Sequence, residues 1–265
     1  MLGAHGTDAE AESSRQQRRG HVSQTIKRAT EIIEHLADRP STLAELADQF
    51  GQHRSTVFRQ LQSLEEAGFV LHRADGTYSI GPRLIAIGQE ALNDFNLRNV
   101  AHDELRELQQ RVGCTVHLAQ LIENSVVYVD KIEDSSGIRM YSRIGKTVLP
   151  QCTGVGKVIL AQITSSRRDD VLAGVEWKPY TANTLLTREA LDAEIEQIRE
   201  DGWGVDDSEF EEITNCIAAP VRDSTGAIVG AISVTALRVL QDLDALQLHL
   251  PDLLETAGRI SARLD

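Results

Sequence analysis

A group of hydrogen-bond donors between residues 53 and 60 has the chemistry needed to contact DNA. From Gly51 to Glu65 the chain carries two arginines and one histidine, and it has no acid before Glu65. Such donors bind base edges in the major groove and phosphate oxygens, whereas a merely solvated helix usually mixes carboxylates among its cations. The predicted DNA-contacting residues are His53, Arg54, Ser55, Thr56, Arg59 and Gln60.

Two short helices and a hairpin are predicted to position these donors. Thr42 and Glu45 have the spacing of a capping box at the start of a first helix. Gly51 suits the left-handed residue that ends this helix, and an amphipathic second helix is expected over about 54–67. Asp75-Gly76 predicts the turn of a hairpin. The arrangement is that of a winged helix-turn-helix, although paired helices before a hairpin also occur in proteins that never contact DNA, and only the donor face favours the DNA interpretation.

Composition limits the other possibilities. The chain has 265 residues and a formal net charge of −13, enough for two domains but unusual for a DNA-binding protein. Residues 1–80 carry 9 Lys/Arg against 11 Asp/Glu, and residues 81–265 carry 18 against 29, so the acidity lies mainly in the second part. The cysteines are an odd number, which suits a reducing cytoplasm. The sequence contains no run of 18 apolar residues, so no membrane partner is expected.

Changes in the spacing of apolar residues divide the chain into four segments. Residues 1–20 are expected to be a disordered tail, 21–81 the winged helix-turn-helix domain, 82–98 a linker helix, and 99–265 a second domain. Ser23 is expected to cap the supporting helix of the first domain, which ends at Arg39-Pro40. The linker helix is expected to place its apolar face against a partner subunit; this face carries Leu84, Ile87 and Ala91.

The second domain is predicted to be α+β, with a largely antiparallel sheet flanked by helices. Its expected strands cover 115–121, 125–132, 138–144, 203–207, 216–222 and 228–237. Its expected helices cover about 100–112, 154–163, 188–201 with Thr187 as cap, and 243–264.

The chain resembles the IclR family of transcriptional regulators over roughly residues 22–262. The motifs that carry the resemblance are TLAELA (42–47), STVFR (55–59), GFV (68–70), YSIG (78–81), VHLAQL (116–121), VVYVDKI (126–132), IRMYSRIGK (138–146), CTGVGKVILA (152–161), GWGVDD (202–207) and CIAAPV (216–221). The resemblance implies a winged helix-turn-helix, a dimerising helical linker and a GAF-like effector-binding domain. It further implies homodimers or dimers of dimers on a palindromic double-stranded operator, controlled by a small metabolite.

The resemblance also implies an effector site. Carried over by motif, Gly154 and Val155 offer N–H groups at a helix start, which favours a carboxylate. The side chains implied around the ligand are Asp206, Cys216, Ser233 and Thr235. The segment 208–215 departs from the pattern of many relatives, because Phe210 and Ile213 stand where an Asn and a Gly are common. Bulkier residues there are expected to narrow the pocket or change the loop.

Three further patterns have residue types found in enzyme or metal sites. Gly154-Val155-Gly156-Lys157 lacks the spacing and the following Ser or Thr of a phosphate-binding loop. Cys114 and His117 form only half of a metal ligand set. Cys216 beside Asp206 has the residue types of a nucleophile and its partner, but Cys216 opens an apolar strand, where a buried inert thiol is the rule. No enzyme activity, cofactor or metal is therefore predicted.

The effector is predicted to be a small organic acid, aromatic acids included. Ser233 and Thr235 share one face of a strand because side chains alternate with period two. Asp206 facing an acid has to be protonated or bind a ligand hydroxyl, so a hydroxy- or keto-acid is favoured over a plain carboxylate. The alternatives left open are a constitutive architectural DNA binder whose second domain only oligomerises, and an enzyme fused to a DNA-binding domain. The sequence leaves repression or activation open too.

Overall fold

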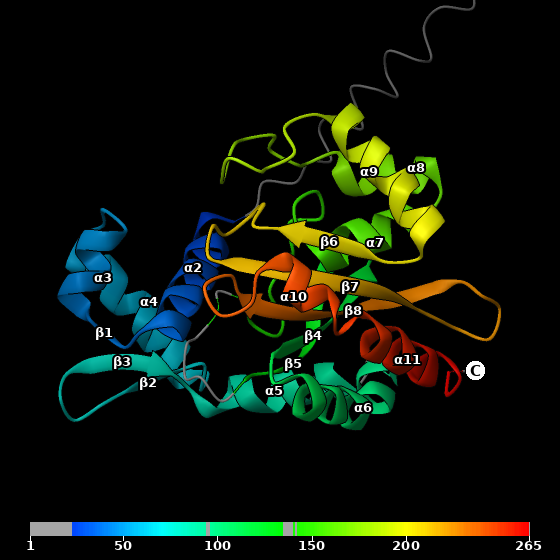
Figure 1. Ribbon diagram of the computed structural model, residues 1–265. Coiled ribbons are helices and arrows are strands. Elements are labelled where there is room, and N and C mark those ends of the chain that lie inside the picture. The colour runs from blue at the N-terminus through cyan, green and yellow to red at the C-terminus, as the bar shows by residue number, and fades with distance from the viewer. Residues whose placement is uncertain (1–22, 94–95, 135–139, 141, 265) are drawn as a thin grey trace, which may run out of the picture. The chain divides into compact units, whose positions relative to one another are not determined.

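The computed structural model describes residues 23–93, 96–134, 140 and 142–264, and the chain forms two compact units, Met1–Ala91 and Leu92–Asp265. The expected disordered tail lies outside the described residues. Figure 1 shows the elements of each unit in chain order. The boundary between the units falls within helix α5 (Pro82–Asn93), inside the segment predicted to be the linker.

The first unit is a helical layer closed by a small antiparallel sheet. Its sheet has the strand order β1-β3-β2. The elements are α2 (Gln24–Asp38), β1 (Ser41–Thr42), α3 (Leu43–Gln49), α4 (Arg54–Glu66), β2 (Val70–His72) and β3 (Thr77–Ile80). Strands β2 and β3 form the predicted hairpin, and Gly76 in its turn has the positive φ of +82° that favours glycine. Helix, turn, helix and wing follow one another as predicted.

Local capping signals set the helix ends of this unit. The Thr42 side chain accepts the Glu45 N–H while the Glu45 carboxylate accepts the Thr42 N–H, so the predicted capping box is present. Gly51 follows α3 with φ +58°, as expected for the turn. Ser23 is the N-cap residue of α2, but the prediction that its side chain caps was wrong, because only its backbone carbonyl accepts a helical N–H, from Lys27.

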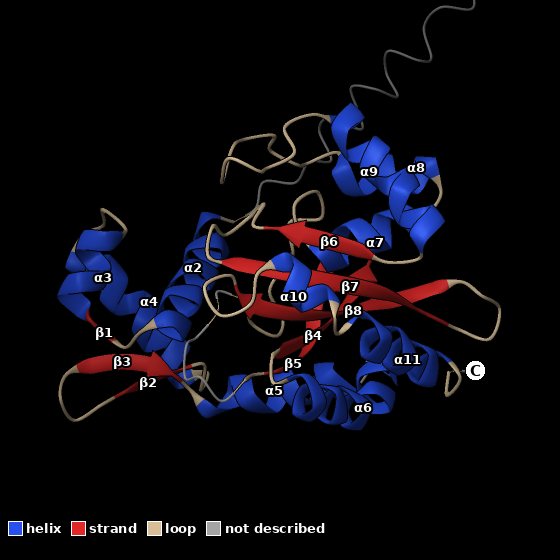
Figure 2. Cartoon of the chain, viewed as in Figure 1, coloured by secondary structure: helices blue, strands red, loops and turns tan. Residues whose placement is uncertain are grey.

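The second unit has a five-stranded antiparallel sheet of order β5-β4-β8-β7-β6 with helices on both faces (Figure 2). The strands are β4 (Thr115–Ile122), β5 (Ser125–Ile132), β6 (Gly204–Asp207), β7 (Thr214–Arg222) and β8 (Ile228–Leu237). The helices are α6 (Asn96–Val112), α7 (Gly154–Gln162), α8 (Ser165–Leu172), α9 (Arg188–Asp201), α10 (Leu243–Gln247) and α11 (Leu250–Ser261).

Alternation along the strands gives this sheet two apolar faces. One face packs with α6 and α11 through side chains such as Leu118 and Val234. The other face packs with α7 and α9 through small side chains such as Ala218 and Ala231. The small residues bring α7 close to the sheet. Next to this contact, the same face carries polar side chains, and it is there that a pocket forms.

Two predicted elements of the second unit were wrong in part. The expected strand 138–144 lies partly outside the described residues, and its described members, Met140 and residues 142–144, are not strand. The chain instead turns at Gly145, which has φ +84°, and residues 145–148 then contact β5 through backbone hydrogen bonds to Val126 and Tyr128 and one isolated bridge at Thr147. The expected helix 243–264 is divided into α10 and α11, because Pro251 has no N–H to donate and is tolerated only in the first turn of α11. Strand β1 and helix α8 were not predicted.

Candidate DNA-contacting helix and ligand pocket

Helix α4 presents the predicted donors away from the core of the first unit. Its inner side is buried through Val57, Leu61 and Leu64. On the outer side five of the predicted residues are exposed and Gln60 is half-buried; the exposed ones are His53, Arg54, Ser55, Thr56 and Arg59. Within the described residues neither Arg54 nor Arg59 takes part in an ion pair. The structure therefore gathers the donors on one surface, where their guanidinium groups are accessible.

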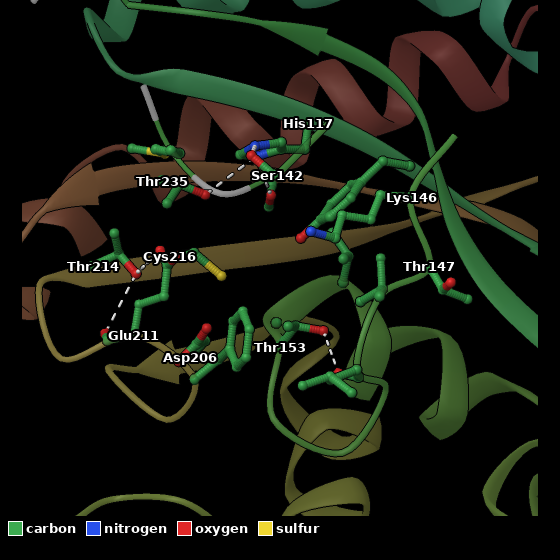
Figure 3. A pocket seen from close by; sticks show the side chains of 18 of the residues that line it. His117, Ser142, Lys146, Thr147, Thr153, Asp206, Glu211, Thr214, Cys216 and Thr235 are labelled. Atoms are coloured by element: carbon green, nitrogen blue, oxygen red, sulfur yellow. Dashed lines mark hydrogen bonds between the residues drawn. The ribbon is translucent and has the colours of Figure 1, made fainter. Parts of the chain in front are cut away.

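A cavity of about 410 Å³ opens in the second unit between the sheet, the start of α7 and two loops. All six residues predicted for the effector site line it: Gly154, Val155, Asp206, Cys216, Ser233 and Thr235. They come from the start of α7 and from three neighbouring strands. Figure 3 shows Asp206 and His117 on opposite sides of this cavity, with Cys216 between them.

The register of the sheet explains why these distant residues meet. Asp206 on β6 pairs with Cys216 on β7, and Cys216 pairs with Thr235 on β8. One row further, Ser233 on β8 pairs with His117 on β4. Because residues directly opposite each other point to the same face, the two rows form the floor of the cavity.

The start of α7 closes the cavity over β6 and β7. The N-cap residue Thr153 does not cap with its side chain, which instead donates to the Leu149 carbonyl at 2.8 Å. The first-turn N–H groups of α7 are thus left to other partners, at the positive end of the helix dipole. Glycine is required at 154, because a Cβ there would lie 2.6 Å from the Cys216 sulfur. Only this close approach lets the helix start reach the strands.

Asp206 is a buried carboxyl with an unusual protonation equilibrium. Burial raises the pKa of Asp206 to about 7, and the charge of Glu209 adds to this, while the Glu209 N–H and Lys157 oppose it. The Asp206 Oδ1 accepts that N–H at 2.7 Å. Around neutral pH the side chain is therefore divided between a carboxylate and a carboxylic acid that can donate a hydrogen bond to a ligand.

A buried ionic cluster lies directly behind Asp206. The Lys157 ammonium group on α7 is fully buried and bonds to the carboxylates of Glu194 on α9 and Glu209 after β6. Burial raises the pKa of Glu209, and Lys157 opposes that shift. Lys157, the lysine of the Gly-x-Gly-Lys motif, points into this cluster and does not line the cavity. The motif therefore has a structural lysine, which argues against a phosphate-binding loop.

The cysteines are buried thiols. Burial, with the charge of Asp206 adding to it, raises the pKa of Cys216 above its ordinary value. Burial likewise raises the pKa of Cys152 to about 12. A nucleophilic Cys216 would need a lowered pKa, so the geometry opposes that interpretation. Cys114 packs with the α6 and α11 face of the sheet, whereas His117 lines the cavity on the other face, so the two do not form a metal site.

His117 and Ser142 line the cavity beside the predicted Ser233 and Thr235, and the sequence reasoning did not name either of them for the effector site. The His117 Nε2 lies 2.7 Å from the Ser142 Oγ, and its Nδ1 lies 3.4 Å from the Ser233 Oγ and 3.3 Å from the Thr235 Oγ1. Burial, with Lys131 adding to it, lowers the pKa of His117 to about 3, so the ring is neutral. The alternation of side chains along β4 indicates that His117 lies on the opposite face from Val116 and Leu118. Only the pairing of β4 with β8 shows that this face is the one that carries Ser233 and Thr235.

The departure at 208–215 affects the cavity through one of its two residues. Phe210 lines the cavity and stacks edge-on against Tyr180, with ring centroids 5.2 Å apart. Ile213 does not line it and is 64% exposed. The expected narrowing can therefore come only from Phe210.

Two lysines also line the cavity, Lys146 and Lys178, and Lys178 pairs with Glu176 at 2.8 Å.

Two family models together match almost all of the described chain. The model described as "Bacterial transcriptional regulator IclR C-terminal" matches residues 89–262, and "IclR helix-turn-helix domain" matches residues 25–74. The chain is 35% identical over 228 residues to the HTH-type transcriptional regulator KdgR of Escherichia coli (strain K12), covering 86% of this chain and 87% of that protein. In the part of the chain that the structure describes, no helix has the length and apolar character needed to span a membrane.

Solved structures share the fold. The Thermotoga maritima IclR crystal structure has a TM-score of 0.76 and 34% identity, covering 91% of this chain and 98% of that one. A crystal structure of an IclR homolog complexed with 4-hydroxybenzoate, from Microbacterium hydrocarbonoxydans, has a TM-score of 0.75 and covers 91% of this chain and 99% of that one. At 22% identity the second likeness concerns the fold alone.

Proposed function

The chain belongs to the IclR family of bacterial DNA-binding transcriptional regulators, and we propose that a small organic acid bound in its second unit controls its attachment to a double-stranded operator. The observation that carries the proposal is the cavity beside α7. It combines a helix N-terminus, a carboxyl with a pKa of about 7 and strand hydroxyls in one space of about 410 Å³. These groups suit a ligand that has a carboxylate and further polar atoms.

The proposed DNA contact is the outer side of α4. Its exposed donors have the chemistry for base edges and phosphates, and the first unit supplies the helix-turn-helix and wing that place such a helix in the major groove. The proposed site residues are the N-cap residue His53 and, on α4, Arg54, Ser55, Thr56, Arg59 and Gln60. Because the proposed partner is the bacterial chromosome, the proposed location of the protein is the cytoplasm.

The proposed assembly is a homodimer, or a dimer of dimers, joined through the linker helix. Residues 82–98 are assigned to the linker because α5 carries apolar side chains that the first unit leaves uncovered; Ile85 is 66% exposed and Ile87 is 47% exposed. The flanking segments are the DNA-binding domain at 21–81 and the effector-binding domain at 99–265. Two-fold pairing doubles the number of bases read, as a palindromic operator requires.

The experiment begins with a duplex selected from a random pool by the purified protein. Fluorescence anisotropy then measures the affinity for that duplex with and without each of a panel of hydroxy-, keto- and aromatic acids, including 4-hydroxybenzoate. At least one acid is expected to change the affinity about tenfold or more. Gly154→Ala should abolish the response, because its Cβ would meet the Cys216 sulfur, whereas a Cβ at Gly174 meets nothing within 4 Å, so Gly174→Ala is the matched control.

Each negative result points to a different alternative. Tight DNA binding that no acid alters, together with a melting temperature that no acid raises, would favour the architectural DNA binder. A response that survives Gly154→Ala would place the effector outside this cavity. Chemical turnover of a bound acid would favour an enzyme fused to a DNA-binding domain.

A further inference from the structure

We propose that Phe58 recognises a thymine of the operator, by packing its ring against the C5-methyl group of that base in the major groove. The inference rests on the proposed DNA contact of α4 and goes beyond it, because it adds an apolar contact to the hydrogen-bond donors and specifies one base. The other large apolar side chains of α4, those of Val57, Leu61 and Leu64, are buried, whereas Phe58 is 47% exposed.

Phe58 lies among the predicted donors on the surface of the helix. Residues three and four positions apart are neighbours on an α-helix, so Phe58 adjoins Arg54 and Ser55 towards the start of α4 and Gln62 towards its end. The core cluster of the first unit does not include Phe58, and its ring stacks on no other ring among the described residues. The ring is therefore available to a partner that the donors bind.

The chemistry of the groove makes thymine the base that suits this ring. Thymine carries the one methyl group among the base edges of the major groove. The other edges present ring nitrogens, carbonyl oxygens and amino groups, and a phenyl ring over them would remove their water without offering a hydrogen bond. Packing against the methyl group instead buries apolar surface on both partners.

The charge around Phe58 favours DNA over a second copy of this chain as the partner. A two-fold contact brings the same surface of both copies together. The guanidinium groups of Arg54 and Arg59 would then approach those of the second copy, and the helix offers no acid before Glu65 to offset the repulsion. The phosphates that line the groove have the opposite charge.

The helix geometry places this thymine near a guanine. Four residues of an α-helix rise about 6 Å, so Phe58 lies about 6 Å beyond Arg54 along the helix axis. Successive bases of one DNA strand are about 3.4 Å apart along the duplex axis. Guanine is the base that arginine most often binds in the major groove. The thymine is therefore expected within about two base pairs of a guanine in each half-site.

The test is a thymine-to-deoxyuridine scan of the duplex selected by the wild type, with the affinity measured by fluorescence anisotropy. Deoxyuridine lacks the methyl group and keeps the polar edge of thymine. In the wild type, the replacement at one position of each half-site should weaken binding about fourfold, the effect of one buried methyl group. The same scan is made with Phe58→Ala, Phe58→Leu and Ile26→Ala, each checked by circular dichroism.

The variants separate the ring from the rest of the DNA-binding domain. Phe58→Ala should weaken binding to the selected duplex about fourfold or more and should leave almost no response to deoxyuridine. Phe58→Leu keeps an apolar side chain, so it should retain most of the response. Ile26→Ala is the matched control, because Ile26 is an apolar residue of α2 that is 64% exposed, and it should retain the full response.

The possible failures are distinguishable. If every thymine tolerates deoxyuridine in the wild type, the proposed function stands and the thymine contact is wrong. The contact is also wrong if deoxyuridine weakens binding of Phe58→Ala as much as that of the wild type, because the methyl group then acts through the shape of the DNA. A lower mass of Phe58→Ala in light scattering, with equal losses on selected and random DNA, would assign Phe58 to a subunit contact instead. If the wild type selects no duplex, both the proposed function and the thymine contact are overturned.

Discussion

Replacing Asp206 with asparagine is expected to stabilise the second unit at alkaline pH. In the fold its pKa is raised to about 7, from 3.8 for the free side chain, mainly by burial. Between these two values the folded protein holds a proton that the unfolded chain has lost, so stability falls as the pH rises through this window. Above pH 7 the loss is complete and amounts to about 4 kcal/mol, at about 1.4 kcal/mol for each pH unit between the two pKa values.

Asparagine removes the charge and keeps the hydrogen bond. Its amide oxygen can still accept the Glu209 N–H that now donates to Asp206 Oδ1 at 2.7 Å. The titratable groups that face Asp206 from the surrounding elements are Tyr128 on β5, Cys152 before α7, Lys157 on α7, Glu209 and Glu211 after β6, and Cys216 on β7. We therefore expect a gain of about 2–4 kcal/mol at pH 8 and almost none at pH 4.

The assay is denaturation by guanidinium chloride, followed by tryptophan fluorescence at both pH values. Both tryptophans, Trp177 and Trp203, belong to the second unit, so the signal reports that unit. Asp207→Asn is the matched control, because Asp207 is the next residue of β6 and points to the opposite face of the sheet. Equal stability of Asp206→Asn and the wild type at pH 8, or a loss of stability there, would refute the proposed cost of burying this charge.

Four further predictions concern the effector, the buried Lys157, the DNA contact and the assembly. Affinity for an acidic effector should increase as the pH falls through about 7, because protonated Asp206 donates to the ligand where the carboxylate repels it; calorimetry with a flat pH profile would contradict this. Lys157→Met should lower the free energy of unfolding by about 3–5 kcal/mol, because Glu194 and Glu209 lose their buried cation. A loss below about 1 kcal/mol in the same denaturation assay would contradict this role of Lys157. Arg59→Ala should cost about 1–3 kcal/mol on the selected duplex and much less on random DNA, measured by anisotropy. An equal loss of binding free energy on the selected duplex and on random DNA would indicate that Arg59 contacts phosphate. No loss on either DNA would contradict the placement of α4 in the major groove. Light scattering should give at least twice the chain mass of 29.2 kDa, and a monomer that still protects a palindrome at micromolar concentration would contradict the pairing.

The elements that the sequence predicted well are those defined by local chemistry. The capping box of Thr42 and Glu45 and the cap at Thr187 both depend on residues three positions apart. Gly51 and Gly76 have the positive φ that the predicted helix end and hairpin turn require. Such signals depend only on residues a few positions apart, so they do not depend on the tertiary contacts of the rest of the chain. Pro251 was an equally local signal, and it could have indicated the division between α10 and α11.

The parts of the site that were missed depend on strand pairing. His117 joins Ser233 because β4 pairs with β8, more than a hundred residues along the chain, and nothing in either segment specifies that register. Lys157 meets Glu194 and Glu209 for a similar reason, since three separate elements converge behind the cavity. The six residues carried over from the family resemblance line one cavity without this knowledge, because the family's motifs already contain the pairing.

The arrangement behind the cavity places buried charged groups next to the proposed effector site. The Lys157 ammonium group pairs with the carboxylates of Glu194 and Glu209, and its charge also acts on the carboxyl group of Asp206. The backbone N–H of Glu209 holds Asp206, and its side chain holds Lys157, so one residue connects the cavity to α7 and α9. The proposed acid would fix the proton of Asp206 and place its own carboxylate where Asp206 gives up its charge. The resulting change falls on the segment after β6, which also carries Phe210 and Glu211 into the cavity. Binding of the proposed effector and the packing of α7 would therefore share a common set of contacts, as control of DNA binding by an effector requires.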